Sequence, residues 1–321
     1  MDKMLELKFP IIALANVLGK THQAIHKFCN ENNIEISTGK GRSFLMPQSL
    51  RQYFKKFNYK YPKEIIAFQA CKGGVGKTSL CFNIAARAAQ YGAKVLTVDM
   101  DMQAHLTMAL LGDNDTDSLV WHDILKGTPI EETIKEIHPH LHLIPSHLDN
   151  SYLDKIISQS SKVVYTKYVY DHLMKIRENY DLILIDCAPA LSHINTSVAL
   201  ATDKVFIPVN PDLFSFDGLE KTLSELTDIQ NGFHKELDVN VILNRFDSRE
   251  KNSLDVIASL KNKYGALLCP TVVIVSAEIK NAIARHELLF NLKKRPQVAE
   301  DIDTIVKDLL ALKEISNAQT L

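Results

Sequence analysis

The feature that most restricts the fold of this chain is a regular alternation, from residue 64 onward, of short apolar segments and longer amphipathic segments. Apolar segments of strand length that alternate with helices indicate a parallel sheet with helices on both faces. The expected strands are Ile65–Ala70, Lys94–Val98, Leu141–Pro145, Leu182–Asp186, Val205–Val209, Val239–Leu243 and Thr271–Val275. The expected helices include Thr78–Gln90, Tyr165–Glu178, Gly218–Asn231, Leu254–Lys263 and Val298–Leu312. We therefore predict an α/β fold.

A glycine-rich segment joins the first expected strand to the first expected helix, and it reads Lys72-Gly73-Gly74-Val75-Gly76-Lys77-Thr78-Ser79. Glycines let a backbone approach a phosphate chain closely, and the N-terminus of the following helix adds N–H donors. We expect Lys77 to contact the terminal phosphates and the Thr78 hydroxyl to hold Mg²⁺. The usual pattern has glycine at the position of Cys71, and this chain instead carries a second lysine, Lys72. The segment predicts a P-loop that binds ATP with magnesium.

Carboxylates follow two of the expected strands. Asp99 and Asp101 come at the end of one strand, and Asp186 ends the buried strand Leu182–Asp186. Ligands of open α/β sheets bind at this carboxyl edge. Because Mg²⁺ keeps much of its hydration shell, we expect Asp186 to hold the ion through water.

Together these segments resemble the ParA/MinD family of P-loop ATPases. The resemblance implies that Lys72 crosses a dimer interface to the partner's nucleotide, that Asp101 orients the attacking water and that Asp99 supports the magnesium shell. It also places Asn244, at the end of a strand, against adenine. The implied catalytic residues are Lys72 and Asp101. The implied nucleotide-binding residues are Lys72, Gly73, Gly74, Val75, Gly76, Lys77, Thr78, Ser79 and Asn244, and the implied metal-binding residues are Thr78, Asp99 and Asp186.

The resemblance extends from about Ile65 to Leu312, with some departures. Met102 stands where members of the family usually have proline, and Cys187-Ala188-Pro189 replaces their proline-rich switch. The five cysteines lie far apart without a Cys-x-x-Cys pair, which argues against a metal centre and against a reductase of the nitrogenase-iron-protein kind.

The first sixty residues form a separate, basic region. They hold ten Lys/Arg against four Asp/Glu, whereas the rest of the chain holds 27 against 34. Apolar spacing predicts a helix from Ile11 that ends at Gly19, and a second helix capped by Thr21 with Ala24, Ile25 and Phe28 facing inward. Two strands, Ile34–Ser37 and Ser43–Met46, are expected to flank a glycine-rich tip. A third helix is expected from Pro47, with Leu50, Tyr53 and Phe54 on one face.

This pattern resembles the winged helix–turn–helix of MerR-type regulators. The resemblance implies that the second helix reads DNA bases in the major groove while the tip of the hairpin contacts phosphates. The candidate DNA-binding residues are Gln23, His26, Lys27, Lys40 and Arg42. The alternative is a helical module that packs or binds protein.

We divide the chain into two domains. Residues 1–60 are the DNA-binding arm with its linker, and residues 61–321 are a P-loop ATPase domain. The polar stretch that serves as the linker, 55–63, extends across this boundary. The cut lies before the first expected strand, so we expect removal of the arm to leave nucleotide binding intact.

The combined resemblance implies a partition ATPase that forms a homodimer with ATP. The arm would bind specific DNA, the dimer would bind DNA without sequence preference, and a ParB-like partner would stimulate hydrolysis. Larger members of the family with such an arm can also repress their own operon. We expect a cytoplasmic protein, because no signal-peptide pattern or membrane-length apolar run is present. We also expect it to be nucleoid-associated without a membrane partner, because the polar face of the helical stretch Asp301–Leu310 is acidic and anionic lipid would repel it. Two alternatives remain: a MinD-like ATPase that cycles on a membrane, and a repressor that uses ATP as a ligand.

Overall fold

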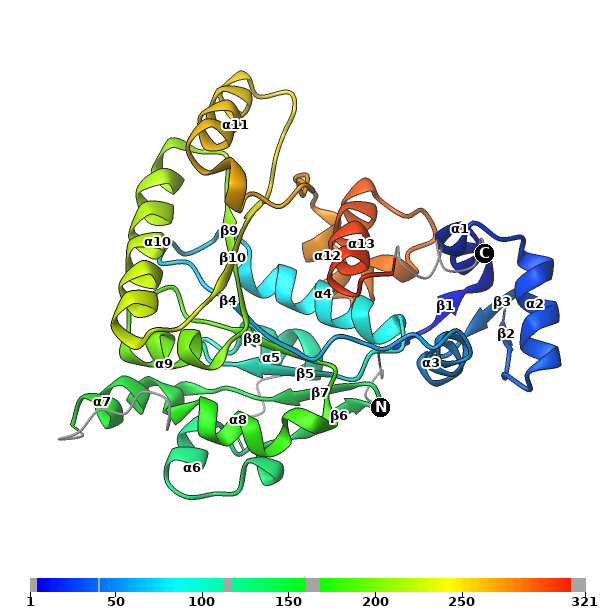
Figure 1. Ribbon diagram of the computed structural model, residues 1–321, viewed down its shortest axis with the longest axis horizontal. Coiled ribbons are helices and arrows are strands. Elements are labelled where there is room, and N and C mark those ends of the chain that lie inside the picture. Colours follow the sequence, from blue (N-terminus) through cyan, green and yellow to red (C-terminus); the bar gives the residue numbers. More distant parts are fainter. Residues whose placement is uncertain (1–4, 40, 113–116, 160–167, 313–321) are drawn as a thin grey trace.

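The computed structural model describes residues 5–39, 41–112, 117–159 and 168–312. Within them the main sheet has the strand order β10-β9-β4-β8-β5-β7-β6 (Figure 1). Neighbouring strands are parallel except at one edge, where β6 runs antiparallel to β7. The strands are β4 Glu64–Phe68, β5 Val95–Asp99, β6 Lys135–His138, β7 Leu141–Ile144, β8 Leu182–Asp186, β9 Lys204–Val209 and β10 Asp238–Leu243. The predicted α/β fold is confirmed.

The α-helices that flank this sheet agree with most of the expected ones. The exception is Tyr165–Glu178, of which Tyr170–Ile176 is α-helical and residues 165–167 lie outside the described part. The helices are α4 Lys77–Gln90, α5 His105–Leu111, α6 Trp121–Leu125, α7 Leu153–Ser158, α8 Tyr170–Ile176, α9 His193–Ala201, α10 Leu213–Phe233, α11 Lys251–Tyr264, α12 Glu278–Ala284 and α13 Gln297–Leu309.

Helices cover both faces of the sheet because successive strand residues point into two different apolar cores. In β8, Leu182 and Leu184 belong to a core shared with α4 and α13. Ile183 and Ile185 belong to a second core shared with α8 and α9. The carboxylate that ends this strand is therefore carried on a rigid, fully buried element.

The expected strand at Thr271–Val275 does not join the sheet, so this prediction was wrong. The segment meets the chain beyond β10 at an isolated bridge between Phe246 and Ile274. The N–H of Cys269 donates to the carbonyl of Val241 and the N–H of Val273 donates to that of Leu243, so three residues rather than one stand between successive donors and no regular ladder forms along β10. The N–H groups of Val273 and Val275 donate to the carbonyls of Leu243 and Phe246, and the N–H of Ile274, between them, donates to the carboxylate of Asp301 at 3.1 Å.

The N-terminal residues form two helices, a hairpin and a third helix, which we call the N-terminal unit (residues 5–55). Its elements are β1 Phe9–Pro10, α1 Ile11–Leu18, α2 His22–Glu31, β2 Ser37–Gly39, β3 Arg42–Leu45 and α3 Pro47–Lys55. The predicted helix ends are confirmed: Gly19 follows α1 with φ +63°, and the Thr21 hydroxyl accepts a hydrogen bond from the N–H of Ala24 at 3.2 Å. β3 lies between β1 and β2 in a small antiparallel sheet.

Two details of this unit differ from expectation. Ala24 is exposed, because the buried stripe of α2 is formed by Ile25 and Cys29, one helical turn apart, and Ala24 lies beside that stripe toward solvent. The first strand of the hairpin begins at Ser37 rather than Ile34, since only residues close to the tip pair with β3.

The stretch 55–63 is not a free linker. The hydroxyl of Tyr59 donates to the carbonyl of Leu310, and the hydroxyl of Tyr61 donates to the carbonyl of Tyr91 at 2.8 Å. One apolar core also runs without interruption from the N-terminal unit into the face of the sheet covered by α4 and α13. The division of functions at residue 60 stays a prediction, whereas the packing joins the two parts into one body.

Candidate nucleotide site

The glycine-rich loop lies between β4 and α4, at the carboxyl edge of the sheet. Gly74 and Gly76 have φ of +76° and +97°, which residues with side chains rarely adopt. A Cβ on Gly76 would lie 2.2 Å from the side-chain nitrogen of Asn244. The helix α4 begins at Lys77 directly after the loop, so its first N–H groups are available to a phosphate. The predicted strand–loop–helix arrangement is therefore present.

Lys77 and Asp186 supply the buried charges of this loop. The ammonium of Lys77 lies 3.4 Å from the carbonyl oxygens of both Ala70 and Lys72. Burial lowers the pKa of Lys77, and the negative charge of Asp186 opposes that shift. Asp186 is 1% exposed, and neither of its carboxylate oxygens has a hydrogen-bond partner among the described residues. Burial raises the pKa of Asp186 well above its usual range.

This arrangement fits a magnesium ion. Leaving a buried carboxylate without partners costs free energy, which a bound cation relieves. The Thr78 hydroxyl is near enough to oppose the rise in the pKa of Asp186, although it makes no hydrogen bond of ordinary geometry with it. Mg²⁺ takes few protein ligands and keeps several waters. Thr78 and Asp186 are therefore suitable residues to hold the ion beside a nucleotide phosphate.

Asp99 and Asp101 follow β5 and have different surroundings. The carboxylate of Asp99 accepts hydrogen bonds from the N–H of Asp101 at 3.1 Å and from the N–H and hydroxyl of Thr107 at 2.9 and 2.8 Å. Burial raises the pKa of Asp99 to about 7, and the bonds from Thr107 oppose the rise. Asp99 thus fixes the loop that carries Asp101. Its share in the magnesium shell stays a prediction.

Asp101 lines the pocket beside the P-loop. One of its carboxylate oxygens accepts a hydrogen bond from the N–H of Gln103 at 3.0 Å. The residue is 9% exposed, so it is oriented by the loop and still faces the space that a nucleotide would fill. Its predicted role in orienting water is compatible with this position.

Two residues that follow β10 hold the backbone of the P-loop. The side-chain amide of Asn244 donates to the carbonyl of Val75 at 2.7 Å, and the guanidinium of Arg245 donates to the carbonyl of Gly74 at 3.0 Å. Arg245 has φ +57°, a left-handed conformation that aims its side chain at the loop. Asn244 thus holds the P-loop, and its predicted contact with adenine stays a prediction. Sequence reasoning gave Arg245 no role.

Lys72 is held on the outer side of the loop. Its ammonium donates to the carboxylate of Asp212 at 2.7 Å and to the hydroxyl of Ser215 at 2.9 Å. Asp212 is the residue before α10, and Ser215 lies in the first turn of that helix. Lys72 does not line the pocket, whereas Lys77 does. The two loop lysines therefore have different surroundings in this structure. In sequence, the loop Ile207–Phe214 resembles one that lines the dimer face of the family, but this resemblance did not identify Asp212 and Ser215 as partners of Lys72.

The contact between Lys72 and Asp212 gives a first prediction. If Lys72 must reach a partner subunit, Asp212→Ala frees it and strengthens ATP-dependent dimerisation. The ion pair is partly exposed, and such pairs contribute about 0.2–1 kcal/mol, so we expect a change of about twofold to fivefold in the dimer dissociation constant. Sedimentation at several protein concentrations measures it, with Asp247→Ala as the control for loss of a carboxylate. Weaker dimerisation of Asp212→Ala would show that Asp212 supports the dimer instead.

One pocket of about 1030 Å³ lies beside the P-loop, and Lys72, Asp99 and Asp186 are not among the residues that line it. It extends from the P-loop to α5 and α12, and the segment after Pro270 forms one of its walls. The lining residues that the sequence predicted are Gly74, Gly76, Lys77, Thr78, Ser79, Asp101 and Asn244. Its size and the convergence of glycine, cation and carboxylate suit a nucleoside triphosphate with its metal.

Comparisons with known proteins agree with this geometry. A family profile described as an AAA domain matches residues 63–239, more than half of the chain. The chain is 27% identical to the cell division protein PomZ of Myxococcus xanthus, over 74% of this chain and 75% of PomZ. It is also 27% identical to the chromosome partitioning protein ParA of Caulobacter vibrioides, over 72% of this chain and 89% of that protein. The chain belongs to the ParA-type family of P-loop ATPases.

The fold of this ParA-type ATPase also matches a solved structure. The ATP complex of a Cyanothece McdA variant superimposes with a TM-score of 0.70 and 24% identity, over 77% of this chain and 96% of that one. This likeness supports the fold alone. The matched region of the family profile begins at residue 63, so the N-terminal unit lies outside it.

The predicted DNA-binding residues are placed apart from the nucleotide site. On α2, Gln23 and Lys27 are exposed and His26 is partly exposed. Arg42 is exposed on β3, beside the tip of the hairpin. Lys40 lies outside the described residues. None of the four described residues lines the nucleotide pocket.

Proposed function

We propose that this ParA-type ATPase is a DNA partition protein that dimerises on ATP, binds DNA and hydrolyses ATP when a ParB-like protein stimulates it. The observation that carries the proposal is the separation of the two loop lysines. Lys77 lies inside the pocket, and Lys72 lies outside it on Asp212 and Ser215. A loop lysine that does not line the pocket of its own subunit can reach the nucleotide of a second subunit once it leaves Asp212.

The proposed cofactors are ATP and Mg²⁺. The unpartnered carboxylate of Asp186 and the adjacent Thr78 suit the ion, and Lys77 suits the phosphates that the ion bridges. Bound magnesium would neutralise phosphate charge. The chain's own residues orient the reactants: Asp101 holds the attacking water, while Asn244 and Arg245 hold the loop.

DNA is the proposed partner of the N-terminal unit. The first sixty residues carry a charge balance of +6, and α2 presents polar and basic side chains to solvent. A helix of this kind, capped after a tight turn, suits the major groove. The proposal includes sequence-specific binding through Gln23, His26, Lys27, Lys40 and Arg42, repression of the chain's own operon, and a nucleoid-associated, cytoplasmic location.

A MinD-like cycle on a membrane is the second candidate, and the last described helix argues against it. The apolar face of α13 is buried in the core, with Val298, Ile302 and Val306 at 0% exposure. A helix of this kind has no free apolar face to lay into lipid. In the described part of the chain, no helix combines the length and the apolar character that a bilayer crossing requires.

Sedimentation without nucleotide, with ADP and with ATP, each with and without DNA, tests the proposal. We expect a dimer only with ATP, and its co-sedimentation with DNA. A chain that stays monomeric with ATP at every concentration contradicts the dimer. The remaining alternative is a repressor that uses ATP only as a ligand. Measuring ATP turnover tests it, since such a repressor hydrolyses no ATP even when DNA and a centromere-binding partner are present.

Asp101→Ala is expected to stop hydrolysis and leave dimers to accumulate in ATP. Positioned groups that assist proton transfer contribute about a hundredfold or more to rate, and Asp101 faces the pocket from a loop fixed by Asp99. Phosphate release measures turnover, and sedimentation measures the dimer. Asp149→Ala, which removes an exposed carboxylate elsewhere, is the control. Turnover of Asp101→Ala at the rate of the unchanged protein would assign the water-orienting role to another group.

A further inference from the structure

The chain segment between β8 and α9 forms part of the wall of the nucleotide pocket. Asp186 ends β8, and Pro189, shortly after it, lines the pocket. A Cβ on Gly73 of the P-loop would lie 3.9 Å from two carbon atoms of Pro189, so the proline packs beside the P-loop. Asp186 is directly paired with Asp99 of β5 in the parallel ladder. The segment after β8 and the loop that carries Asp101 therefore leave the sheet side by side.

Residues 188–190 form a tight turn with Pro189 at its apex. The N–H of Ala190 donates to the carbonyl of Ala188 at 2.9 Å, which closes a three-residue turn. Pro189 and Ala190 are exposed, and Pro189 has no N–H of its own that could fix its position. A short exposed turn of this kind depends on a neighbouring element to hold it.

Asn195 of α9 holds this turn. Its side-chain amide donates to the carbonyl of Ala188 at 3.1 Å and to that of Ala190 at 2.6 Å, so one group holds the turn on both sides of Pro189. Asn195 is buried, and its side-chain oxygen has no hydrogen-bond partner among the described residues. Exchange of the amide nitrogen and oxygen would place an oxygen against two carbonyls. What this side chain provides is therefore its two N–H groups.

The backbone of Asn195 is bonded to the segment that leads into the P-loop. The side-chain amide of Gln69 donates to the carbonyl of Asn195 at 2.9 Å. Gln69 directly follows β4 and is buried, and its own N–H donates to the carbonyl of Phe206 on β9 at 3.0 Å. One residue of α9 thus connects the start of the P-loop with the turn that follows Asp186.

We propose that Asn195 is a positioning residue for ATP hydrolysis, which acts by holding the turn at Pro189 against the P-loop. Asn195 does not line the pocket, whereas Pro189 shares it with Lys77 and Asp101. A turn that moves shifts the wall of the site, and misplacement of reacting groups by about 1 Å can lower a rate about a hundredfold. Affinity for ATP depends on Lys77 and the N–H groups of the P-loop, and Asn195 bonds to none of these.

Phosphate release by the full-length chain at a series of ATP concentrations tests this role. Asn195→Ala removes both bonds to the turn, and Asn195→Asp keeps the shape of the side chain but replaces its donors by acceptors. For both variants we expect kcat to fall at least about tenfold, while KM and the dissociation constant of a fluorescent ATP analogue change less than about twofold. kcat is expressed per nucleotide-binding site, so a partly unfolded sample loses sites rather than rate. Sedimentation with ATP should match that of the unchanged chain.

Two further variants complete the test. Ser197→Ala removes a buried hydroxyl of the same helix, which donates to the carbonyl of His193, and its kcat should stay within about twofold of the unchanged chain. Pro189→Gly loosens the turn from its exposed side, where the core is not disturbed, and should lower kcat as Asn195→Ala does. If neither Asn195 variant folds, Pro189→Gly decides by the same criterion.

Three results would overturn the proposal. The first is an unchanged kcat per site in the Asn195 variants. The second is a parallel loss of kcat and ATP affinity, because Asn195 then holds the P-loop itself. The third is altered sedimentation with ATP, because the lower rate then follows from the association of subunits. The proposal rests on the ATPase activity of the family and needs neither DNA nor a second protein, so these results leave the proposed partition function standing.

Discussion

Lys77→Ala is expected to abolish ATP binding, whereas Lys72→Ala is expected to bind ATP normally and to lose dimerisation and turnover. Lys77 is 6% exposed inside the pocket, where its charge meets phosphate directly. A hydrogen bond to a charged group contributes about 1.5–3 kcal/mol, so loss of two such bonds weakens ATP binding at least about a hundredfold. Lys72 contacts Asp212 and Ser215 outside the pocket. Its removal therefore takes away no hydrogen bond to the ATP that is bound by the same subunit.

Titration with a fluorescent ATP analogue measures affinity, and sedimentation with ATP measures dimerisation. Lys261→Ala, which removes an exposed lysine from α11, is the control for loss of one positive charge. Equal loss of ATP affinity in Lys72→Ala and Lys77→Ala would contradict the division between the two lysines. Normal dimerisation of Lys72→Ala would contradict the contact across subunits and leave ATP binding by Lys77 unaffected.

The central fold was predictable because its physical signals are local. A strand buried on both faces is a continuous apolar run, as in Leu182–Asp186, and the helices between strands carry apolar residues at helical spacing. The signal failed where strands are short or interrupted. Lys135–His138 has a charged start and pairs only at the sheet edge, so β6 was not predicted. Thr271–Val275 has a strand-like composition, but two extra residues between the bonds that Cys269 and Val273 make to β10 interrupt the ladder.

The sequence predicted those residues of the nucleotide site that lie close to one another along the chain. Spacing identifies Lys72 to Ser79 and the carboxylates that end β5 and β8, since each follows directly from its strand. Partners that come from distant residues carry no such signal. Asp212 lies 140 residues from Lys72, and Arg245 lies 171 residues from Gly74, and only the folded sheet brings each pair together.

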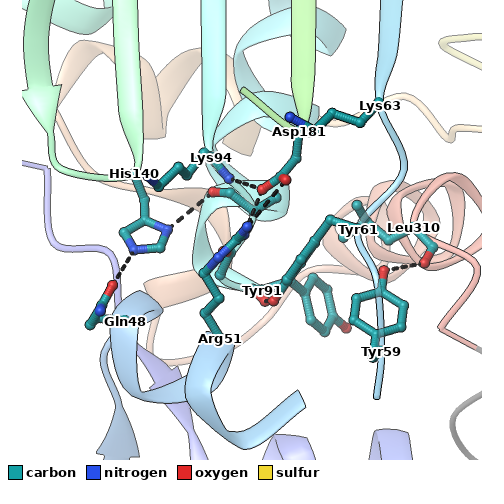
Figure 2. Close-up of polar contacts among 12 residues, drawn as sticks. Gln48, Arg51, Tyr59, Tyr61, Lys63, Tyr91, Lys94, His140, Asp181 and Leu310 are labelled. Atoms are coloured by element: carbon teal, nitrogen blue, oxygen red, sulfur yellow. Dashed lines mark hydrogen bonds and ion pairs between the residues drawn. The ribbon is translucent and has the colours of Figure 1, made fainter. Parts of the chain in front are cut away.

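The polar stretch 55–63 shows how composition can mislead. Four lysines give it the character of a linker. Its two tyrosines, Tyr59 and Tyr61, pack their rings against the body, and their hydroxyls donate hydrogen bonds to backbone carbonyls (Figure 2). A tyrosine combines apolar area with one polar tip, so it suits an interface and a solvated loop equally well in sequence. Contacts, not composition, decide whether the N-terminal unit is separable.

Removal of residues 1–60 is therefore expected to destabilise the ATPase body strongly, contrary to the expectation from sequence. The loss includes Phe9, which is fully buried and forms one wall around the guanidinium of Arg87, 4.3 Å away. Arg87 is 1% exposed and paired with Asp303, so opening this wall disturbs a buried ion pair as well as the apolar core. Burial of one large apolar side chain contributes about 1.5–3 kcal/mol, and whole domains are stable by only about 5–15 kcal/mol.

Urea unfolding of point variants tests this coupling even if the truncated chain proves insoluble. Phe9→Ala is expected to lower the free energy of unfolding by about 3–5 kcal/mol, because it leaves a cavity between the N-terminal unit and α4. Ile12→Ala, in the same unit but 65% exposed, should change it by less than about 0.5 kcal/mol. A single unfolding transition in both variants would agree with one cooperative body. If Phe9→Ala instead unfolds the N-terminal unit alone in a first transition, and the body then unfolds at the midpoint of the unchanged chain, the unit is a separable arm and the expectation from sequence stands.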